Sequence, residues 1–172
     1  MKIELFPLDR VEIDGVSVFL GMDRASVEAA MGVGKEQRVR NCNYYHSSDI
    51  AISFGEENKV DFIQVSGDIN GHIEAVIYGV SVFDVGADEL VELLTRMNDG
   101  EIHDKEKGYS YSFLNISVGI YREFLPASIQ QMVEEMKAGG IPTENNPDLE
   151  ADKWKAEHWC TIGIGVPGYY HT

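Results

Sequence analysis

The pentapeptide Gly-Val-Ser-Val-Phe occurs twice in this chain, at residues 15–19 and at residues 79–83. At the same 64-residue offset, further identities follow without gaps and pair Val27 with Val91, Glu28 with Glu92, Tyr45 with Tyr109, Ile52 with Ile116, Ser53 with Ser117 and Gly55 with Gly119. Chance would give about two or three identities over residues 15–55, whereas at least eleven are present. We therefore predict a tandem duplication, with convergence of two similar strand–turn–helix pieces as the alternative.

Both copies show the same order of hydrophobic patterns. In the first copy, β-branched residues around Gly15 predict strand structure, a short helix follows Asp23, and strands are expected over 43–46, 50–54 and 59–65. In the second copy, we expect a strand over 73–83, a helix over 88–97 and strands of period two over 109–113 and 116–120. Each copy is therefore predicted to be a strand–helix–meander unit.

The second copy departs from the first where its last strand would be expected. Pro126 opens a predicted helix that Gly139 and Gly140 close, and a short helix over 148–159 precedes a strand over 160–166. Large aromatic side chains usually pack, so Trp154 and Trp159 are expected to fasten this last part of the chain to the body.

A helix laid over an antiparallel meander buries one sheet face and leaves the other in water. We therefore predict an α+β fold in which two repeats, at about 11–72 and 73–140, form one domain over residues 1–140. The tandem repeat is expected to make one curved sheet with the helices on one face. Residues 141–172 are expected to be a C-terminal tail packed on the same domain.

Acidic residues outnumber basic residues by 29 to 14, which gives a formal net charge of −15 at neutral pH. Nucleic acids and anionic membranes attract basic proteins, so this charge argues against both as partners. Hydrophobic residues make up 44% of the chain, an ordinary share for a globular protein, so the acidic side chains are expected on its surface. A basic protein is therefore the expected partner of this acidic surface.

The first residues and the cysteines predict a cytoplasmic location. Charged residues and Pro7 interrupt the N-terminal segment, so a signal-peptide hydrophobic region is not expected, and no window approaches 18 apolar residues. Cys42 and Cys160 lie 118 residues apart without the spacing of a disulfide framework, which favours a reducing compartment.

No catalytic or cofactor motif is complete. Residues 32–35 superficially match a phosphate-binding loop, but Glu36 stands where Ser or Thr would bind magnesium, so a helix terminus is preferred. The histidines show no metal-ligand spacing. His158 lies two residues from Cys160 without an identifiable further partner, and a buried structural cysteine is expected. We therefore predict a non-enzymatic protein with no metal and no cofactor.

Tyrosines gather on corresponding strands of the two copies, next to acidic turns. Tyrosine is favoured at protein interfaces because it covers apolar area with few rotatable bonds and keeps a hydroxyl for hydrogen bonding. Packing of these rings in the core is the alternative. The predicted partner-binding residues are Tyr44, Tyr45, His46, Asp49, Glu56, Glu57, Asp104, Tyr109 and Tyr111.

Residues 11–66 resemble a known repeat. The order is a strand, the sequence Leu20-Gly21-Met22-Asp23, a helix that ends at Gly32, and a meander that contains Tyr45 and Ile52-Ser53-Phe54. This order is similar to the repeat of beta-lactamase inhibitory protein and of the small SmpA/OmlA-type lipoprotein domains. Residues 73–121 match more weakly, with Val85 and Gly86 in place of Gly21 and Met22. The resemblance implies protein binding through a concave sheet face, without catalysis.

Together, these features predict an acidic protein-binding inhibitor, in particular a bacterial immunity protein that neutralises a basic toxin domain such as a nuclease. Exported members of the resembled group carry a signal peptide, which this sequence is not expected to have. The alternative is a small-ligand-binding or assembly domain that uses the groove between the repeats, and a third candidate is an enzyme without a recognisable motif. The oligomeric state stays open, because an open sheet edge permits dimerisation without requiring it.

Overall fold

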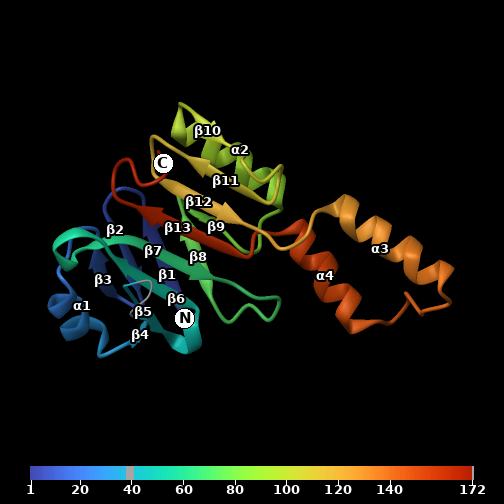
Figure 1. Cartoon of the computed structure of the whole chain (residues 1–172), viewed down its shortest axis with the longest axis horizontal. Coiled ribbons are helices and arrows are strands. Elements are labelled where there is room, and N and C mark those ends of the chain that lie inside the picture. The colour runs from blue at the N-terminus through green and yellow to red at the C-terminus, as the bar shows by residue number, and fades with distance from the viewer. Residues whose placement is uncertain (38–40, 172) are drawn as a thin grey trace.

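The computed structural model describes residues 1–37 and 41–171 and shows a mixed α+β fold with two sheets and four α-helices in those residues (Figure 1). The five-stranded sheet has the order β3-β2-β1-β8-β9, with β1 Lys2–Phe6, β2 Arg10–Ile13, β3 Val16–Phe19, β8 Glu74–Ile77 and β9 Val80–Ser81. The eight-stranded sheet has the order β10-β11-β12-β13-β7-β6-β5-β4, with β4 Lys35–Gln37, β5 Cys42–Tyr45, β6 Ile50–Phe54, β7 Val60–Ser66, β10 Ile102–His103, β11 Ser110–Phe113, β12 Val118–Tyr121 and β13 Thr161–Gly165. The helices are α1 Arg24–Met31, α2 Ala87–Asn98, α3 Pro126–Ala138 and α4 Pro147–Glu157. Among the described residues, no helix has the length and apolar character needed to cross a membrane.

Two sheets are present instead of the single curved sheet that the sequence predicts. The difference arises at the repeated pentapeptide, because the first residue of each copy lies in the tight turn of a hairpin. Asp14-Gly15 joins β2 to β3 with φ values of 46° and 84°, and Tyr78-Gly79 joins β8 to β9 with φ values of 51° and 78°. Two successive positive φ values are typical of the type I′ turn, which suits the twist of paired strands. The single strand expected over 73–83 is therefore two short strands.

The first strand, β1, has no counterpart among the predicted strands and joins the two hairpins. It pairs antiparallel with β2 and parallel with β8, with Lys2 opposite Glu74. Because side chains alternate along a strand, Ile3 and Leu5 are buried while Glu4 points to the opposite face. The five-stranded sheet thus has one face in the core and one face in water.

The eight-stranded sheet consists of two runs of strands that meet at a central pair. Within each run, the strands β4 to β7 and the strands β10 to β13 lie side by side in sequence order. The central pair is β7 and β13, which run antiparallel with Ile63 opposite Ile164. β5 begins 68 residues before β11, whereas the two pentapeptides are 64 residues apart. The difference of four residues equals the difference in length between α2, with 12 residues, and α1, with eight. Tyr45 and Tyr109, which match at the 64-residue offset, therefore do not hold equivalent positions in their strands.

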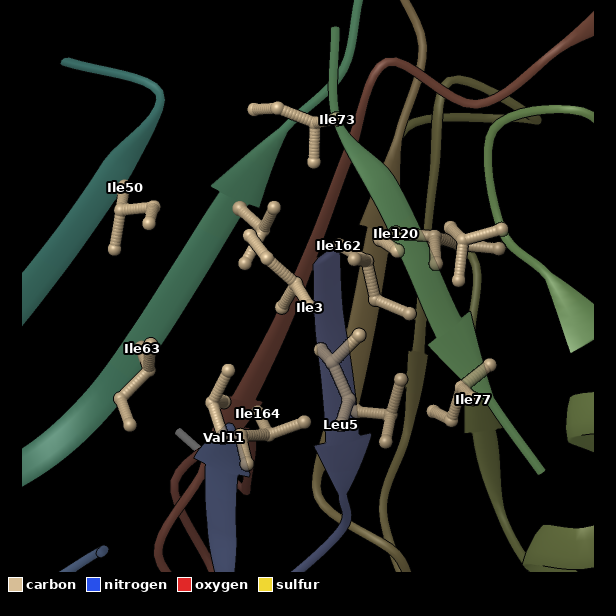
Figure 2. Packing of buried hydrophobic residues seen from close by; sticks show 14 of the residues in the cluster. Ile3, Leu5, Val11, Ile50, Ile63, Ile73, Ile77, Ile120, Ile162 and Ile164 are labelled. Carbon is tan, nitrogen blue, oxygen red and sulfur yellow. The ribbon is translucent and has the colours of Figure 1, made fainter. Parts of the chain in front are cut away.

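The hydrophobic core lies between the two sheets. Figure 2 shows inward side chains of both sheets meeting there, among them Ile3, Leu5, Val11 and Ile77 of the five-stranded sheet and Ile50, Ile63, Ile120, Ile162 and Ile164 of the eight-stranded sheet. Val27 of α1 and Leu90 and Leu94 of α2 belong to the same buried cluster. One core therefore draws side chains from both halves of the chain.

The helices α3 and α4 form a helical hairpin that projects from the sheets (Figure 1). They lie between β12 and β13 in the sequence and pack on each other around a small separate cluster of Ile129, Leu149 and Ala156. The chain then returns, and β13 pairs on both sides, with β12 and with β7. Residues 161–165 therefore form the strand that the sequence predicts over 160–166, and this strand lies inside the eight-stranded sheet.

Trp159 anchors the return of the chain from α4 into the sheet. Its side chain is fully buried, and the indole Nε1 donates a hydrogen bond to the backbone oxygen of Ala87 at the start of α2 (2.8 Å). The guanidinium of Arg122 lies 4.9 Å from the ring centroid of Trp159 and donates to the backbone oxygen of Ala156 (3.0 Å). Trp154 is half-buried and stacks on His158, with ring centroids 4.8 Å apart. Trp159 therefore fastens this part of the chain to the body, as expected, whereas Trp154 stacks on His158 of the same segment.

Replacing Trp159 with Phe should lower the free energy of unfolding by about 2–4 kcal/mol, because it leaves a cavity and removes the hydrogen bond to Ala87. Trp154→Phe is the matched control and should cost less than about 1 kcal/mol, because that ring is only half-buried. Urea denaturation followed by circular dichroism compares the two variants. Equal losses would contradict the anchoring role of Trp159.

Candidate functional site

The acidic residues predicted to bind a partner do not form one surface. His46 and Asp49 lie in the turn between β5 and β6, whereas Glu56 and Glu57 lie in the turn between β6 and β7. These turns are at opposite ends of β6, whose five residues span about 16 Å. Asp104 lies in the loop between β10 and β11, on the other side of the central strand pair. These residues therefore do not surround a common aromatic centre.

In β5, only one of the two predicted tyrosines faces outward. Tyr45 is buried, and its hydroxyl donates a hydrogen bond to the backbone oxygen of Gly32 (3.2 Å) and accepts one from Asn43 Nδ2 (3.3 Å). Because side chains alternate, Tyr44 lies on the outer face, opposite Ala51 of β6. Tyr45 is therefore a core residue and is not exposed to a partner.

The tyrosines of the second half also make contacts within the fold. The ring of Tyr111 packs edge-on against Trp159, with centroids 5.7 Å apart. Burial, with a smaller effect from Asp104, raises the pKa of Tyr111. The hydroxyl of Tyr109 lies 3.4 Å from Ser128 Oγ of α3. Tyr111 therefore packs within the fold, which is the alternative to a role in partner binding. Tyr109 lies against the helical hairpin.

The outer face of the five-stranded sheet combines carboxylates with exposed apolar groups. We call this surface the acidic sheet face and define it as the outward side chains Lys2, Glu4, Phe6, Arg10, Glu12, Ser17, Phe19, Glu74 and Val76. A hollow of about 300 Å³ opens on it and is bordered by Lys2, Glu4, Glu12 and Glu74. The alternating pattern of residues 2–6 and 10–13 was the sequence signal for this face, but its acids meet only through the pairing of β1 with β2 and β8.

Three carboxylates of the acidic sheet face stand close together, and Lys2 lies directly opposite one of them, Glu74. Glu4 of β1 is directly opposite Glu12 of β2, and Glu74 of β8 lies diagonally from Glu4. Glu12 pairs with Arg10, with Nη2 and Oε1 2.9 Å apart. Within the described part of the chain, the side chains of Glu4 and Glu74 have no hydrogen bond or ion pair. Like charges directly opposite each other on neighbouring strands destabilise a sheet, so folding alone does not favour this arrangement.

Arg10 connects the carboxylates with two aromatic rings. Its guanidinium lies 4.0 Å from the ring centroid of Phe6 and 5.8 Å from that of Phe19. Hydrogen bonds from Arg10 to Glu12 and to Asp9 raise the pKa of the guanidinium, so its charge is already engaged. Arg10 therefore does not neutralise Glu4 or Glu74.

Phe19 is exposed although the identical pentapeptide buries its counterpart. Phe19 retains 43% of its accessible surface, whereas Phe83, at the same position of the second pentapeptide, retains 3%. The ring of Phe83 lies against Gly67, where a Cβ would collide with it. Phe19 instead ends the edge strand β3. The acidic sheet face thus presents an aromatic ring at its border.

The outer face of the eight-stranded sheet has a different chemistry. A hollow of about 290 Å³ opens where β11, β12, β13 and β7 lie side by side, and we call it the neutral groove. Its lining includes the polar residues Gln64, Ser110, Ser112, Tyr121, Thr161, Tyr169 and Tyr170 and no Asp, Glu, Lys, Arg or His. It lies at the junction of the two halves, where β7 pairs with β13.

The C-terminal residues fold back over this outer face. Tyr169 stacks on Phe62, with ring centroids 4.5 Å apart and an interplanar angle of 2°, and Tyr170 meets Phe62 edge-on at 6.1 Å. A Cβ at Gly163 would collide with the ring of Phe62, and one at Gly119 would collide with Tyr170. These two glycines therefore let the aromatic rings lie close to the sheet. Burial raises the pKa of Tyr170.

Neither cysteine shows the features of an activated nucleophile. Cys42 and Cys160 are both buried and unpaired, and burial raises the pKa of Cys160, which favours the thiol over the reactive thiolate. His158 stacks on Trp154 and holds its Nδ1 3.0 Å from the backbone oxygen of Trp154. Within the described residues, no group of three or more His, Cys, Asp or Glu side chains is arranged to hold a metal ion.

Comparison with known proteins yields no match: no family model, no curated protein and no solved structure shows significant similarity to this chain.

Replacing Glu4 with Gln should raise the free energy of unfolding by about 0.2–1 kcal/mol at low salt, because it removes a charge that faces Glu12. Glu134→Gln, on an exposed position of α3, removes the same charge away from the sheet and should give a smaller gain. Added salt should shrink the gain from Glu4→Gln through screening. Thermal denaturation measures both variants, and a gain no larger than that of the control would contradict the repulsion.

Asp61 in β7 is an acidic residue whose charged form is disfavoured by burial. Its Oδ1 is buried without a hydrogen-bond partner, and burial raises its pKa. Because the folded pKa lies above the unfolded one, the carboxyl favours folding when protonated, and this contribution is lost as pH rises through the folded pKa.

Asp61→Asn should therefore stabilise the protein at pH 7, by less than about 1 kcal/mol because the group is only partly buried. The gain should disappear toward pH 4, where the wild-type carboxyl takes up its proton. Urea denaturation at both pH values measures this, and a gain that is equal at the two pH values would refute the assignment.

Proposed function

We propose that this chain is a non-enzymatic protein-binding module that covers a basic surface of its partner with the acidic sheet face. The observation that carries the proposal is the placement of Glu4 and Glu74 beside Glu12 on an open sheet face, where the side chains of Glu4 and Glu74 make no ion pair within the described part of the chain, although Lys2 lies opposite Glu74. Such an arrangement costs stability in the free protein and becomes favourable when Lys or Arg side chains of a partner arrive.

The apolar groups of the same face complement long basic side chains. Lys and Arg lay their aliphatic stems on apolar surface while their charged ends reach carboxylates. Phe19 is exposed and Val76 half-buried, and Val76 borders the same hollow as Glu4, Glu12 and Glu74. The net charge of −15 adds long-range attraction for a basic partner, which can raise association rates by about 10- to 1,000-fold at low salt.

The proposed architecture is a tandem duplication. Its support is that each half begins with a hairpin closed by two residues of positive φ, continues with a helix and ends with four strands of one sheet. In the second half, α3 and α4 would be an insertion before the last strand. The hairpins of both halves contribute to the five-stranded sheet, which carries the acidic face.

An inhibitor of a basic toxin domain, such as a nuclease, is the biological role that this surface suits best. A nuclease needs a positive surface to hold its substrate, and an acidic protein seated there would block access. Protein binding through a sheet face is also what the resemblance to the beta-lactamase inhibitory protein repeat implies. We place this role in the cytoplasm, where thiols such as the unpaired Cys42 and Cys160 stay reduced.

The test compares three immobilised forms of the protein in lysate of the source organism: the wild type, Glu4→Lys with Glu74→Lys, and Glu134→Lys with Glu144→Lys as a control of equal charge change. A basic protein should be retained by the wild type and the control at low salt. The sheet variant should bind it at least about tenfold more weakly, equivalent to 1.4 kcal/mol. Affinities of the purified partner at low and high salt provide the numbers.

Two results would contradict this proposal. Equal weakening in both variants would mean that only the overall charge matters. Undiminished binding by the sheet variant would mean that the partner contacts another surface.

A further inference from the structure

The neutral groove is uncharged although the protein as a whole is strongly acidic. One quarter of the residues in the chain are Asp, Glu, Lys or Arg, yet the twelve residues that line the hollow include none of them. The groove lies on the eight-stranded sheet, so it is separate from the acidic sheet face of the other sheet. Its chemistry therefore calls for a different kind of ligand from a basic partner.

The hydrogen-bonding groups of the groove are unused. The side chains of Gln64, Ser110, Ser112, Tyr121, Thr161 and Tyr170 have no hydrogen bond to any other described residue. They provide an amide and five hydroxyls, each able to donate and to accept. A purely apolar ligand would bury these groups without partners, at a cost of about 1–3 kcal/mol for each group.

The strand register arranges these groups around a trough. Ser112, Gly119, Gly163 and Gln64 follow one another across β11, β12, β13 and β7. The two glycines in the middle of this row make room for the rings of Tyr170 and Phe62, which lie over Gly119 and Gly163 and form part of the surface of the groove. The next row across the same strands holds Ser110, Tyr121 and Thr161.

Aromatic rings border the trough on two sides. Tyr121 retains 41% of its accessible surface, so its ring is open to a ligand. Tyr170, from the C-terminal residues, lies over Gly119. Rings beside unused hydroxyls and an amide match a ligand that is apolar on one face and carries hydroxyls at its edge.

We propose that the neutral groove is a binding site for a neutral saccharide. A sugar ring has hydroxyls for the free side chains and a C–H face for Tyr121. An anionic ligand would be repelled by the charge of −15, and a cationic ligand would find no carboxylate in the lining. A second hollow of about 480 Å³ shares Ser112, Tyr169 and Tyr170 with the groove and is lined on its other side by His103 and Lys105, so a second sugar unit would reach a basic side chain there.

The test is NMR titration of the ¹⁵N-labelled full chain with three neutral disaccharides, maltose, cellobiose and N,N′-diacetylchitobiose, and with glucuronate as the charged comparison. At least one disaccharide should produce saturable shifts in the amides of residues 62–64, 110–112, 119–121 and 161–163, with glucuronate weaker. Titration to roughly 50 mM reaches well beyond a millimolar Kd.

Tyr121→Ala should weaken this binding by at least about tenfold, whereas Phe19→Ala, which removes a ring of similar exposure from the acidic sheet face, should leave it unchanged. The amide spectra of both variants verify that they are folded. Saturable shifts that Tyr121→Ala abolishes would support the site. The absence of saturable shifts with all three disaccharides, tighter binding of glucuronate, or equal binding by Tyr121→Ala would overturn the proposal.

Discussion

The antiparallel pairing of β7 with β13 is the contact on which the rest of the structure depends. It joins the strands of the first half to those of the second half in one eight-stranded sheet. Ile63 and Ile164 meet across this pair and point into the core. Because β13 comes after the helical hairpin, its entry requires an anchored turn, which the buried Trp159 and its hydrogen bond to Ala87 supply. The core beneath and the neutral groove above both span this junction.

The two sheets pack face to face and leave outer faces of opposite chemistry. One outer face presents Glu4, Glu12 and Glu74 around a hollow, while the other presents hydroxyls, an amide and aromatic rings without charge. Charge on a sheet face selects for charged partners and gives fast, salt-sensitive association. Unused neutral polar groups select by hydrogen-bond geometry instead. The fold thus offers two separate surfaces, which suit different ligands.

Helices and most strands could be predicted because their signals are local. The apolar stripe of α2, Pro126 at the start of α3 and the period-two pattern of β11 depend only on neighbouring residues. The sheet arrangement could not be predicted, because it depends on β1 pairing with β8, about 70 residues away. The hairpin turn at Tyr78-Gly79 was hidden because tyrosine rarely adopts a positive φ. The acidic sheet face was missed because it also depends on strand pairing. Glu4 and Glu12 are eight residues apart, and only the register of β1 and β2 places them opposite each other.

The central claim is that basic groups gather on the acidic sheet face and not wherever the chain is acidic. Titrating the ¹⁵N-labelled protein with a short lysine-rich peptide tests this most directly, because the amide shifts show where the cations settle. The account predicts that the largest shifts occur in residues 2–6, 10–13 and 74–77 and that they fade as salt is added. Shifts concentrated on the acidic helices α3 and α4, or spread evenly over all acidic segments, would contradict it.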